Sequence, residues 1–484
     1  IMPTVRSCLI VACAAALFDT RPAVAQLLDV YRTHELVSAT PAETTLKNMS
    51  CVEVATDRPI ELEDVILQAV CANPQTRKAW ANARAQAAAV GTSEAAYLPT
   101  LNATAGYERD TLRTTYDASA FGLGDIGNSQ NSSSKYGMLN LTWVLFDFGK
   151  RSAALHQARQ LLAAANATQD NVLQTVFFHA AKAWYAVRDA EASVDATRRS
   201  EDIARESLAE ASAKHEAGVG TLSDQLQAQT TWRRAVLDRV SAEGDVRMAI
   251  GALAVSMGLD ANTPLQLAQT EPSPEDAGLS EGVDRLIDEA KIHHPKLVAA
   301  RAMLEAARAN VDAMRAQGRP TVSLAGSLAQ NNPSYQQQPV SLGSPSVSTS
   351  RGSTIGIQVT IPLFEGFASG YRTAQAQAQA DAQEADLRDT ELQVSLDVWE
   401  SYQSLQTDTV NVGNSKDLLA DAQRALDIAR GRYKAGVGTF TELLNAQTAL
   451  TEAQKQRLVA ISKWRTARLK LAASLGNLGL WSAE

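Results

Sequence analysis

The chain has few residues whose type and spacing could support catalysis or metal binding. Its six histidines occur in none of the spacings that metal sites use, such as the helical pair His-Glu-x-x-His. They are His34, His156, His179, His215, His293 and His294. No Gly-x-Ser-x-Gly nucleophile turn or phosphate-binding loop is present, and Gly218-Val219-Gly220 lacks the third glycine of a dinucleotide site. We therefore predict no catalytic, cofactor-binding or metal-binding residues, and we disfavour an enzyme on a helical scaffold.

Cysteine chemistry is the exception. Cys8 and Cys13 lie in an N-terminal segment that we expect to be removed, which leaves Cys51 and Cys71. Two cysteines 20 residues apart in an exported chain suggest one disulfide, which would tie the N-terminal segment to the first helix. The alternative is two free buried thiols.

The N-terminus has the pattern of a secretory signal over residues 1–25. Arg6 precedes an apolar stretch, and Ala23-Val24-Ala25 offers a cleavage site. A buried N-terminal helix and a lipoprotein box ending at Cys13 are the alternatives. After this segment no run of 18 apolar residues occurs, which excludes a membrane-spanning helix. The chain is thus expected to be periplasmic, secreted or a barrel of the outer membrane.

Charge and aromatic content argue against a nucleic-acid partner. The chain carries 45 Lys and Arg against 53 Asp and Glu, a net charge of −8, and only 5% aromatic residues. Nucleic-acid binding favours a basic face with stacking rings.

The sequence contains an internal repeat, so its structural elements are expected to occur twice. Asn73-Pro74 recurs as His294-Pro295, and Leu145-Phe146-Asp147 recurs as Leu363-Phe364-Glu365. Ala217-Gly218-Val219-Gly220-Thr221 recurs as Ala435-Gly436-Val437-Gly438-Thr439. The landmarks keep their order at offsets of 218 or 221 residues, which indicates a tandem duplication.

The duplication predicts a domain plan. An extended segment, 26–58, precedes a first repeat at 59–270, a linker at 271–280, a second repeat at 281–480 and a tail at 481–484. The first repeat comprises helices within 62–96, strands 99–116 and 135–147, a long helix 149–217 and a return helix 223–257. The second comprises helices within 282–316, strands 320–331 and 352–364, a long helix 370–435 and a return helix 441–475. Polar stretches 122–134 and 331–351 are predicted to be exposed loops.

The strands alternate between apolar and polar residues. Leu101, Ala103, Ala105 and Tyr107 share one face of the first strand, and Leu139, Leu141 and Trp143 share one face of the second. The second repeat alternates similarly in Val322, Leu324, Leu328, Ile355, Ile357 and Val359. This pattern is typical of a membrane β-barrel, and the alternative is a hairpin packed on an ordinary core.

Neither part of this plan is complete in one chain. Four strands cannot close a membrane barrel, and an open edge in lipid leaves backbone groups unpaired. Helices of 65 to 69 residues are about 100 Å long and cannot bury their apolar seams in a compact globule. Several copies must therefore pool their strands and helices, although these residues do not fix how many.

In this order the repeated landmarks resemble the TolC family of outer-membrane factors, over nearly all of residues 55–480. The resemblance implies a mostly α fold with a membrane β-barrel contribution, in which three copies form a twelve-stranded barrel and a twelve-helix periplasmic α-barrel tube. It also implies a periplasmic adaptor protein and an inner-membrane transporter as partners, and an outer-membrane location.

The resemblance also assigns roles to the ends of the long helices. The turns Gly218, Val219, Gly220 and Thr221, and Gly436, Val437, Gly438 and Thr439, would dock the adaptor. Ser223, Asp224 and Tyr433 would close the periplasmic entrance, and Glu442 and Asn445 would line it. The sequence departs from the family here. Where the family has a gate arginine, this chain has Gly438, so other residues such as Arg432 would have to supply the charged contacts.

The residues leave the exported substrate open. The cysteine pair and the turns resemble the type I secretion branch, so we predict an export duct for protein toxins served by an ABC-type transporter. A drug or small-molecule duct of the same family is the alternative. A soluble periplasmic coiled-coil protein is a further alternative, which the alternating strands disfavour.

Overall fold

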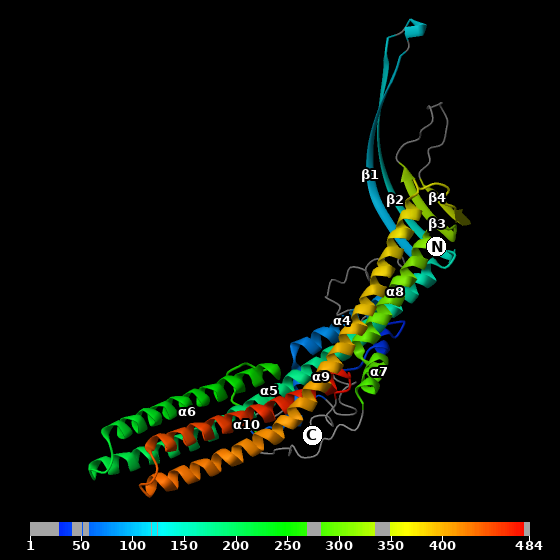
Figure 1. The fold of residues 1–484 in the computed structure, drawn as a ribbon. Helices are drawn as coiled ribbons and strands as arrows, with labels where there is room; N and C mark the ends of the chain where they lie inside the picture. The colour runs from blue at the N-terminus through cyan, green and yellow to red at the C-terminus, as the bar shows by residue number, and fades with distance from the viewer. Residues whose placement is uncertain are drawn as a thin grey trace.

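The computed structural model describes residues 29–40, 51, 58–117, 119–122, 124–268, 282–333 and 349–478. The predicted signal peptide, the linker 271–280 and the tail 481–484 lie outside the described residues, as do much of the extended segment and the middle of the loop 331–351. The described part is elongated, with a β-sheet at one end and two helical hairpins at the other (Figure 1). No described helix is both long enough and apolar enough to cross a membrane.

The elements occur twice in the same order. Each half begins with two short helices, α3 (Leu62–Ala72) and α4 (Pro74–Ala95) or α7 (Val283–His293) and α8 (Pro295–Gln317). A proline disfavours helical backbone at the residue before it, and both Asn73 and His294 are extended, with ψ of 131° and 126°. Each of these residues then caps the next helix through its side chain.

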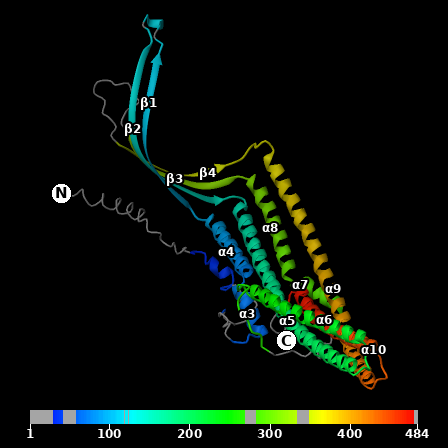
Figure 2. The same ribbon diagram turned by 90° about the vertical axis from the view of Figure 1, so that its left-hand side faces the viewer.

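The long helices form two antiparallel hairpins, α5 (Lys150–Glu216) with α6 (Leu222–Ser256) and α9 (Ala368–Lys434) with α10 (Phe440–Ser474). Both α5 and α9 have 67 residues, hence a length of about 100 Å. The hairpins lie side by side because α5 packs on α10, which gives the order α6, α5, α10, α9 (Figure 1). The turned view shows both hairpins at the end opposite the sheet (Figure 2).

A four-stranded antiparallel sheet joins the two halves at the other end. Its order is β1 (Thr100–Tyr116), β2 (Ile126–Phe146), β3 (Thr321–Pro333) and β4 (Ser350–Thr360). The register places Leu101 opposite Leu141, which lies opposite Gly326 and, beyond it, Ile355. The predicted apolar positions therefore share one face of the sheet, while β1 and β4 remain open edges.

Two predicted strand boundaries were wrong. The second strand begins at Ile126 rather than 135, because residues 126–134 of the expected loop pair with residues 108–116 of β1. That stretch is polar on both faces, so its sequence shows no alternation. The fourth strand ends at Thr360 rather than 364, just before Ile361-Pro362, because proline cannot donate the backbone hydrogen bond that continues a ladder.

The core lies along the helices. One cluster of buried residues surrounds Phe177 and Trp184 of α5, where α3 and the end of α6 meet them. A second joins the hairpins near their turns, around Leu443 and Tyr433. By contrast, the 35-residue helix α6 buries only four described residues, so its outer flank is open.

Candidate functional site: the periplasmic turns

The two turns at the ends of the helical hairpins are built alike. Gly218 follows α5 with a φ of +75°, and Gly436 follows α9 with a φ of +76°. The amide of Val219 donates to the carbonyl oxygen of Lys214 at 2.9 Å, and the amide of Val437 donates to that of Arg432 at 3.0 Å. This is the Schellman helix ending, in which glycine tolerates the left-handed backbone.

The second glycine of each turn is required by close packing instead. A Cβ on Gly220 would lie 3.0 Å from the backbone nitrogen of His215, and one on Gly438 would lie 3.1 Å from that of Tyr433. Thr221 and Thr439 then cap the return helices, accepting from the amides of Asp224 and Glu442 at 3.1 and 3.2 Å.

Each turn presents one apolar side chain to solvent. Val219 is 78% exposed and Val437 is 69% exposed. The eight predicted docking residues thus form two matching protrusions, each an exposed valine held between two glycines whose conformations are fixed by the backbone.

Tyr433 is the most buried of the predicted gate residues. It is 5% exposed, and its ring meets Phe440 edge to face at 5.6 Å. The ammonium of Lys214 lies 3.6 Å from the centroid of the Tyr433 ring and also donates to the Tyr433 carbonyl oxygen. Burial raises the pKa of the Tyr433 phenol, and the carboxylates of Asp224 and Glu210 act in the same direction.

Three of the other predicted gate residues, Glu442, Asn445 and Ser223, are exposed and have surroundings of their own. Glu442 pairs with Arg432 across the turn at 3.7 Å, with both side chains about half exposed. Asn445 is exposed one turn further along the same face of α10. Ser223 is exposed and accepts from Gln227 at 3.2 Å. Among the described residues, the structure brings together Asp224 and Tyr433 but not the whole set.

Sequence reasoning missed the contacts that join the two hairpins. Besides Lys214, these include the ion pair of Glu206 with Arg430 and the buried hydrogen bond from Gln447 to Ser207. Nothing in the spacing of these residues points to them, because each pair is more than 200 positions apart.

A charged network also ties α5 to α6. Glu201 accepts from Arg239 at 2.6 Å and from Arg205 at 2.7 Å, and Arg239 also contacts Glu243 at 2.8 Å. The hydrogen bond from Arg239 lowers the pKa of Glu201 most strongly. This network fixes the first hairpin as a unit well away from its turn.

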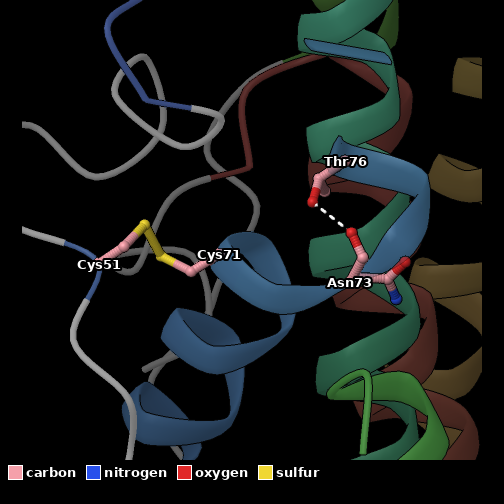
Figure 3. The surroundings of a disulfide bond; sticks show 4 residues. All are labelled: Cys51, Cys71, Asn73 and Thr76. Atoms are coloured by element: carbon pink, nitrogen blue, oxygen red, sulfur yellow. Dashed lines mark hydrogen bonds between the residues drawn. A yellow bond between two sulfur atoms is a disulfide. The ribbon is translucent and has the colours of Figure 1, made fainter. Parts of the chain in front are cut away.

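The predicted cysteine pair forms a disulfide at the start of the first repeat. Cys51 and Cys71 are joined with a Cα–Cα distance of 5.6 Å, next to Asn73, where α3 ends (Figure 3). The bond anchors the N-terminal segment to α3. Before Cys51 in the sequence, Val37 of the N-terminal segment is buried against Ala83, Ala87 and Leu162 of α4 and α5.

These features agree with comparisons to known proteins. A sequence model of the outer membrane efflux protein family matches residues 65–259 and 286–477, which together make up most of the chain. The chain belongs to the outer membrane efflux protein family. This membership confirms the resemblance drawn from the repeated landmarks and places the protein in the outer membrane, with its long helices in the periplasm.

Individual relatives cover most of the chain. Protein CyaE of Bordetella pertussis is 33% identical over 420 residues, 87% of this chain and 85% of its own. Alkaline protease secretion protein AprF of Pseudomonas aeruginosa is 24% identical over 362 residues, 73% of this chain and 72% of its own. The crystal structure of the outer membrane protein VceC of Vibrio cholerae superposes with a TM-score of 0.71 at 21% identity, covering 86% of this chain and 96% of that chain. Members of this efflux family are channel proteins, so the helical turns are understood as parts of a channel.

Proposed function

We propose that three copies of this chain form a continuous export duct from the periplasm to the cell exterior. The observation that carries the proposal is the four-stranded sheet, which has an apolar face, a polar face and two unpaired edges. An open edge is prohibitive in lipid, because its amide and carbonyl groups find no partner there. Pairing β4 of one copy with β1 of the next would remove every edge and give a twelve-stranded barrel.

The exposure of the sheet supports this assembly. Every residue of β4 is exposed in the single chain, including Ile355 at 77% and Ile357 at 69%. Side chains on the apolar face, which includes Ile355 and Ile357, would contact lipid. The opposite face, with Asn102, Thr104 and Gln358, would line the water-filled lumen. Aromatic residues such as Phe364 and Phe367 lie at the helical end of the sheet, where barrels place an interfacial girdle.

The helical flanks support the same arrangement. The order α6, α5, α10, α9 leaves α6 and α9 at the two sides of the chain. Leu237 and Met248 of α6 and Val410 and Ile428 of α9 are all more than 60% exposed. Packing α9 of one copy on α6 of the next would bury these side chains and close a twelve-helix tube. The two repeats of each chain would arise by duplication of one unit.

The periplasmic turns serve two purposes in this proposal. Their matching protrusions dock a periplasmic adaptor, which links the duct to an inner-membrane transporter. Lys214 and Tyr433 hold the neighbouring hairpins together, Asp224 lies near enough to act on the Tyr433 phenol, and these residues would narrow the entrance. Ser223, Glu442 and Asn445 lie on the surfaces that would face it. Protein secretion by a type I system with an ABC transporter is the proposed role, favoured by the Cys51–Cys71 disulfide and by the relative named for alkaline protease secretion.

Native mass measurement of the detergent-extracted protein tests the assembly. Extraction from outer membranes should yield a particle of three chains, whereas a soluble monomer or dimer would reject the barrel. Planar-bilayer conductance then tests the gate. Replacing Asp224 by Asn together with Tyr433 by Phe should raise conductance, while Asp202→Asn, an exposed carboxylate elsewhere on α5, should leave it unchanged. Equal conductance in all three proteins would reject the gate assignment.

Secretion assays separate the substrate classes. A strain that lacks the chain should lose export of the protein substrate of an ABC exporter and keep its resistance to small toxic compounds. Loss of resistance with intact protein export would instead identify a small-molecule duct.

A further inference from the structure

A cleft lies at the other end of the molecule, between the start of α5 and the end of α8, where the helices meet the sheet. Its volume is about 370 Å³, within the range of roughly 300–1,000 Å³ that small-molecule sites have. β2 ends at Phe146, just before α5 begins, and β3 begins at Thr321, just after α8 ends. The cleft would therefore lie at the edge of the proposed barrel, at the level of the lipid headgroups.

The cleft adjoins the face of the sheet that would contact lipid. Phe148, which lines it, meets Phe146 edge to face with ring centroids 4.7 Å apart. Phe146 lies opposite Val322 beyond a β-bulge, and residues directly opposite each other share a face. That face also carries Leu324, so it is the apolar face of the sheet. A lipid beside the barrel would thus find the cleft on its own side of the wall.

The polar lining of the cleft is mainly cationic. Asp312 and Arg315 of α8 line it together with Arg319, which follows the helix. Asp312 and Arg315 pair at 3.1 Å, but their side chains are 66% and 53% exposed, and such pairs are weak enough for a ligand to share both groups. Within the described ranges no carboxylate pairs with Arg319. Ser152 and His156 of α5 add a hydroxyl and an imidazole.

The charges follow one another in a definite order away from the sheet. Arg319 is nearest to β3, Arg315 comes next along α8, and Asp312 is farthest. A phospholipid with its acyl chains in the membrane offers its phosphate nearer the chains, and an ethanolamine headgroup then ends in an ammonium. Guanidinium groups bind phosphate through paired hydrogen bonds, and a carboxylate binds an ammonium. The order of the three side chains therefore matches this zwitterion.

The repeat shows that these charges are not needed for folding. At the offset of 221 residues, Asp312, Arg315 and Arg319 correspond to Gly91, Glu94 and Leu98. In the first repeat the position of Gly91 is covered by Thr33, which a Cβ on Gly91 would meet at 3.0 Å. Each chain thus has one such cleft, although the helices that form it occur twice.

We propose that this cleft binds the headgroup of an ethanolamine phospholipid from the periplasmic leaflet of the outer membrane. Arg315 and Arg319 donate hydrogen bonds to the phosphate, Asp312 accepts from the ammonium, and Phe148 contacts the glycerol end of the lipid. Basic pockets beside membrane-spanning segments recognise headgroups in this way. The inference rests on the proposed trimeric duct, because the barrel sets the level of the cleft in the membrane, and it gives one lipid site per chain.

Native mass spectrometry of the delipidated, detergent-extracted protein tests the site, with palmitoyl-oleoyl phosphatidylethanolamine as the probe. Wild type should bind up to one lipid per chain. Arg319→Gln should weaken this binding by about 10-fold, the effect of losing one charged hydrogen bond. The matched control is Arg372→Gln, which removes the same charge near the start of α9, outside the cleft, and should bind like wild type.

The headgroup is tested by a second variant and two other probes. Asp312→Asn should lose the preference of wild type for phosphatidylethanolamine over phosphatidylglycerol, which has the phosphate but no ammonium. Inorganic phosphate should leave the bound lipid in place. Release of the lipid by inorganic phosphate would show a site for the free anion and overturn the lipid assignment.

The outcomes separate this inference from the proposed function. A particle of three chains to which wild type, Arg319→Gln and Arg372→Gln bind the lipid equally would overturn the inference and leave the duct standing. If Arg319→Gln did not assemble, an unchanged lipid preference in Asp312→Asn would overturn it instead. A wild-type particle without three chains would reject the proposed function itself.

Discussion

The His294 side chain should make the start of α8 sensitive to acid. His294 is 5% exposed and caps α8, because its Nδ1 accepts from the amide of Lys296 at 3.2 Å. An accepting Nδ1 requires the neutral ring. Burial lowers the pKa of His294 from 6.5 to about 4; Lys296 lowers it further, and Asp397 opposes the change.

The sign and size of the effect follow from linkage. Between pH 6.5 and pH 4 the unfolded segment binds a proton at His294 and the folded segment does not, so stability falls as the pH falls through this window. Above pH 6.5 the contribution of the neutral cap is fully present. Going from pH 7 to pH 5 should cost about 2 kcal/mol, or about 20-fold in the local opening equilibrium.

Hydrogen exchange measures this opening directly. The amides of Leu297 and Val298 donate to the His294 carbonyl oxygen, so their protection, corrected for intrinsic exchange, should fall by about 20-fold at pH 5. The control is His294→Asn, because the equivalent Asn73 caps α4 in the same way, accepting from the amide of Gln75 at 2.8 Å. This variant should keep the cap and lose the pH dependence. Wild type and variant with the same pH dependence would refute the reasoning.

Three further substitutions have outcomes that the structure determines. Gly220→Ala places a Cβ 3.0 Å from backbone and should cost about 1–3 kcal/mol, seen as faster proteolysis of the first turn; an unchanged cleavage rate would contradict it. Arg151→Met removes the guanidinium that lies 2.8 Å from the 7% exposed Asp147, which then keeps only the backbone amides of Gly149 and Arg151 as donors. Loss of this ion pair should cost about 3 kcal/mol, seen as a lower thermal dissociation temperature, and no shift would count against it. Replacing Cys51 and Cys71 by Ser releases a 20-residue loop closure, about 3 kcal/mol, so the N-terminal segment should become protease-sensitive, and full resistance would argue against anchoring by the disulfide.

The sequence predicts the fold where hydrophobic period and breakers agree. The Asn73-Pro74 and His294-Pro295 steps end their helices because proline restricts the preceding residue, and the glycine turns end the long helices for conformational reasons. The alternating strands also align as expected, because slipping one residue would place the apolar positions on both faces.

The sequence does not predict structure that depends on contacts between segments far apart in the chain. Residues 126–134 form a strand because residues 108–116 satisfy their backbone groups, and two polar faces leave no periodic signal. The contact of Lys214 with Tyr433 depends on how α5 lies against α9, which local propensity does not encode. The internal repeat identifies the positions equivalent to Lys214 and Tyr433, but it does not show which of the two sets is buried within one chain.

Equivalent residues of the two repeats are buried to different extents in the single chain, so they contribute unequally to its folding stability. Phe440 is 3% exposed and its equivalent Leu222 is 55% exposed, although the two turns have the same backbone. Burying an apolar side chain of this size contributes about 1.5–3 kcal/mol to folding stability. The single chain gains this contribution at Phe440 and lacks most of it at Leu222. The same holds for the sheet, whose strand β4 buries no residue. In the proposed trimer these exposed apolar side chains would be covered by neighbouring copies, so the unfolding of the protein should depend on its concentration.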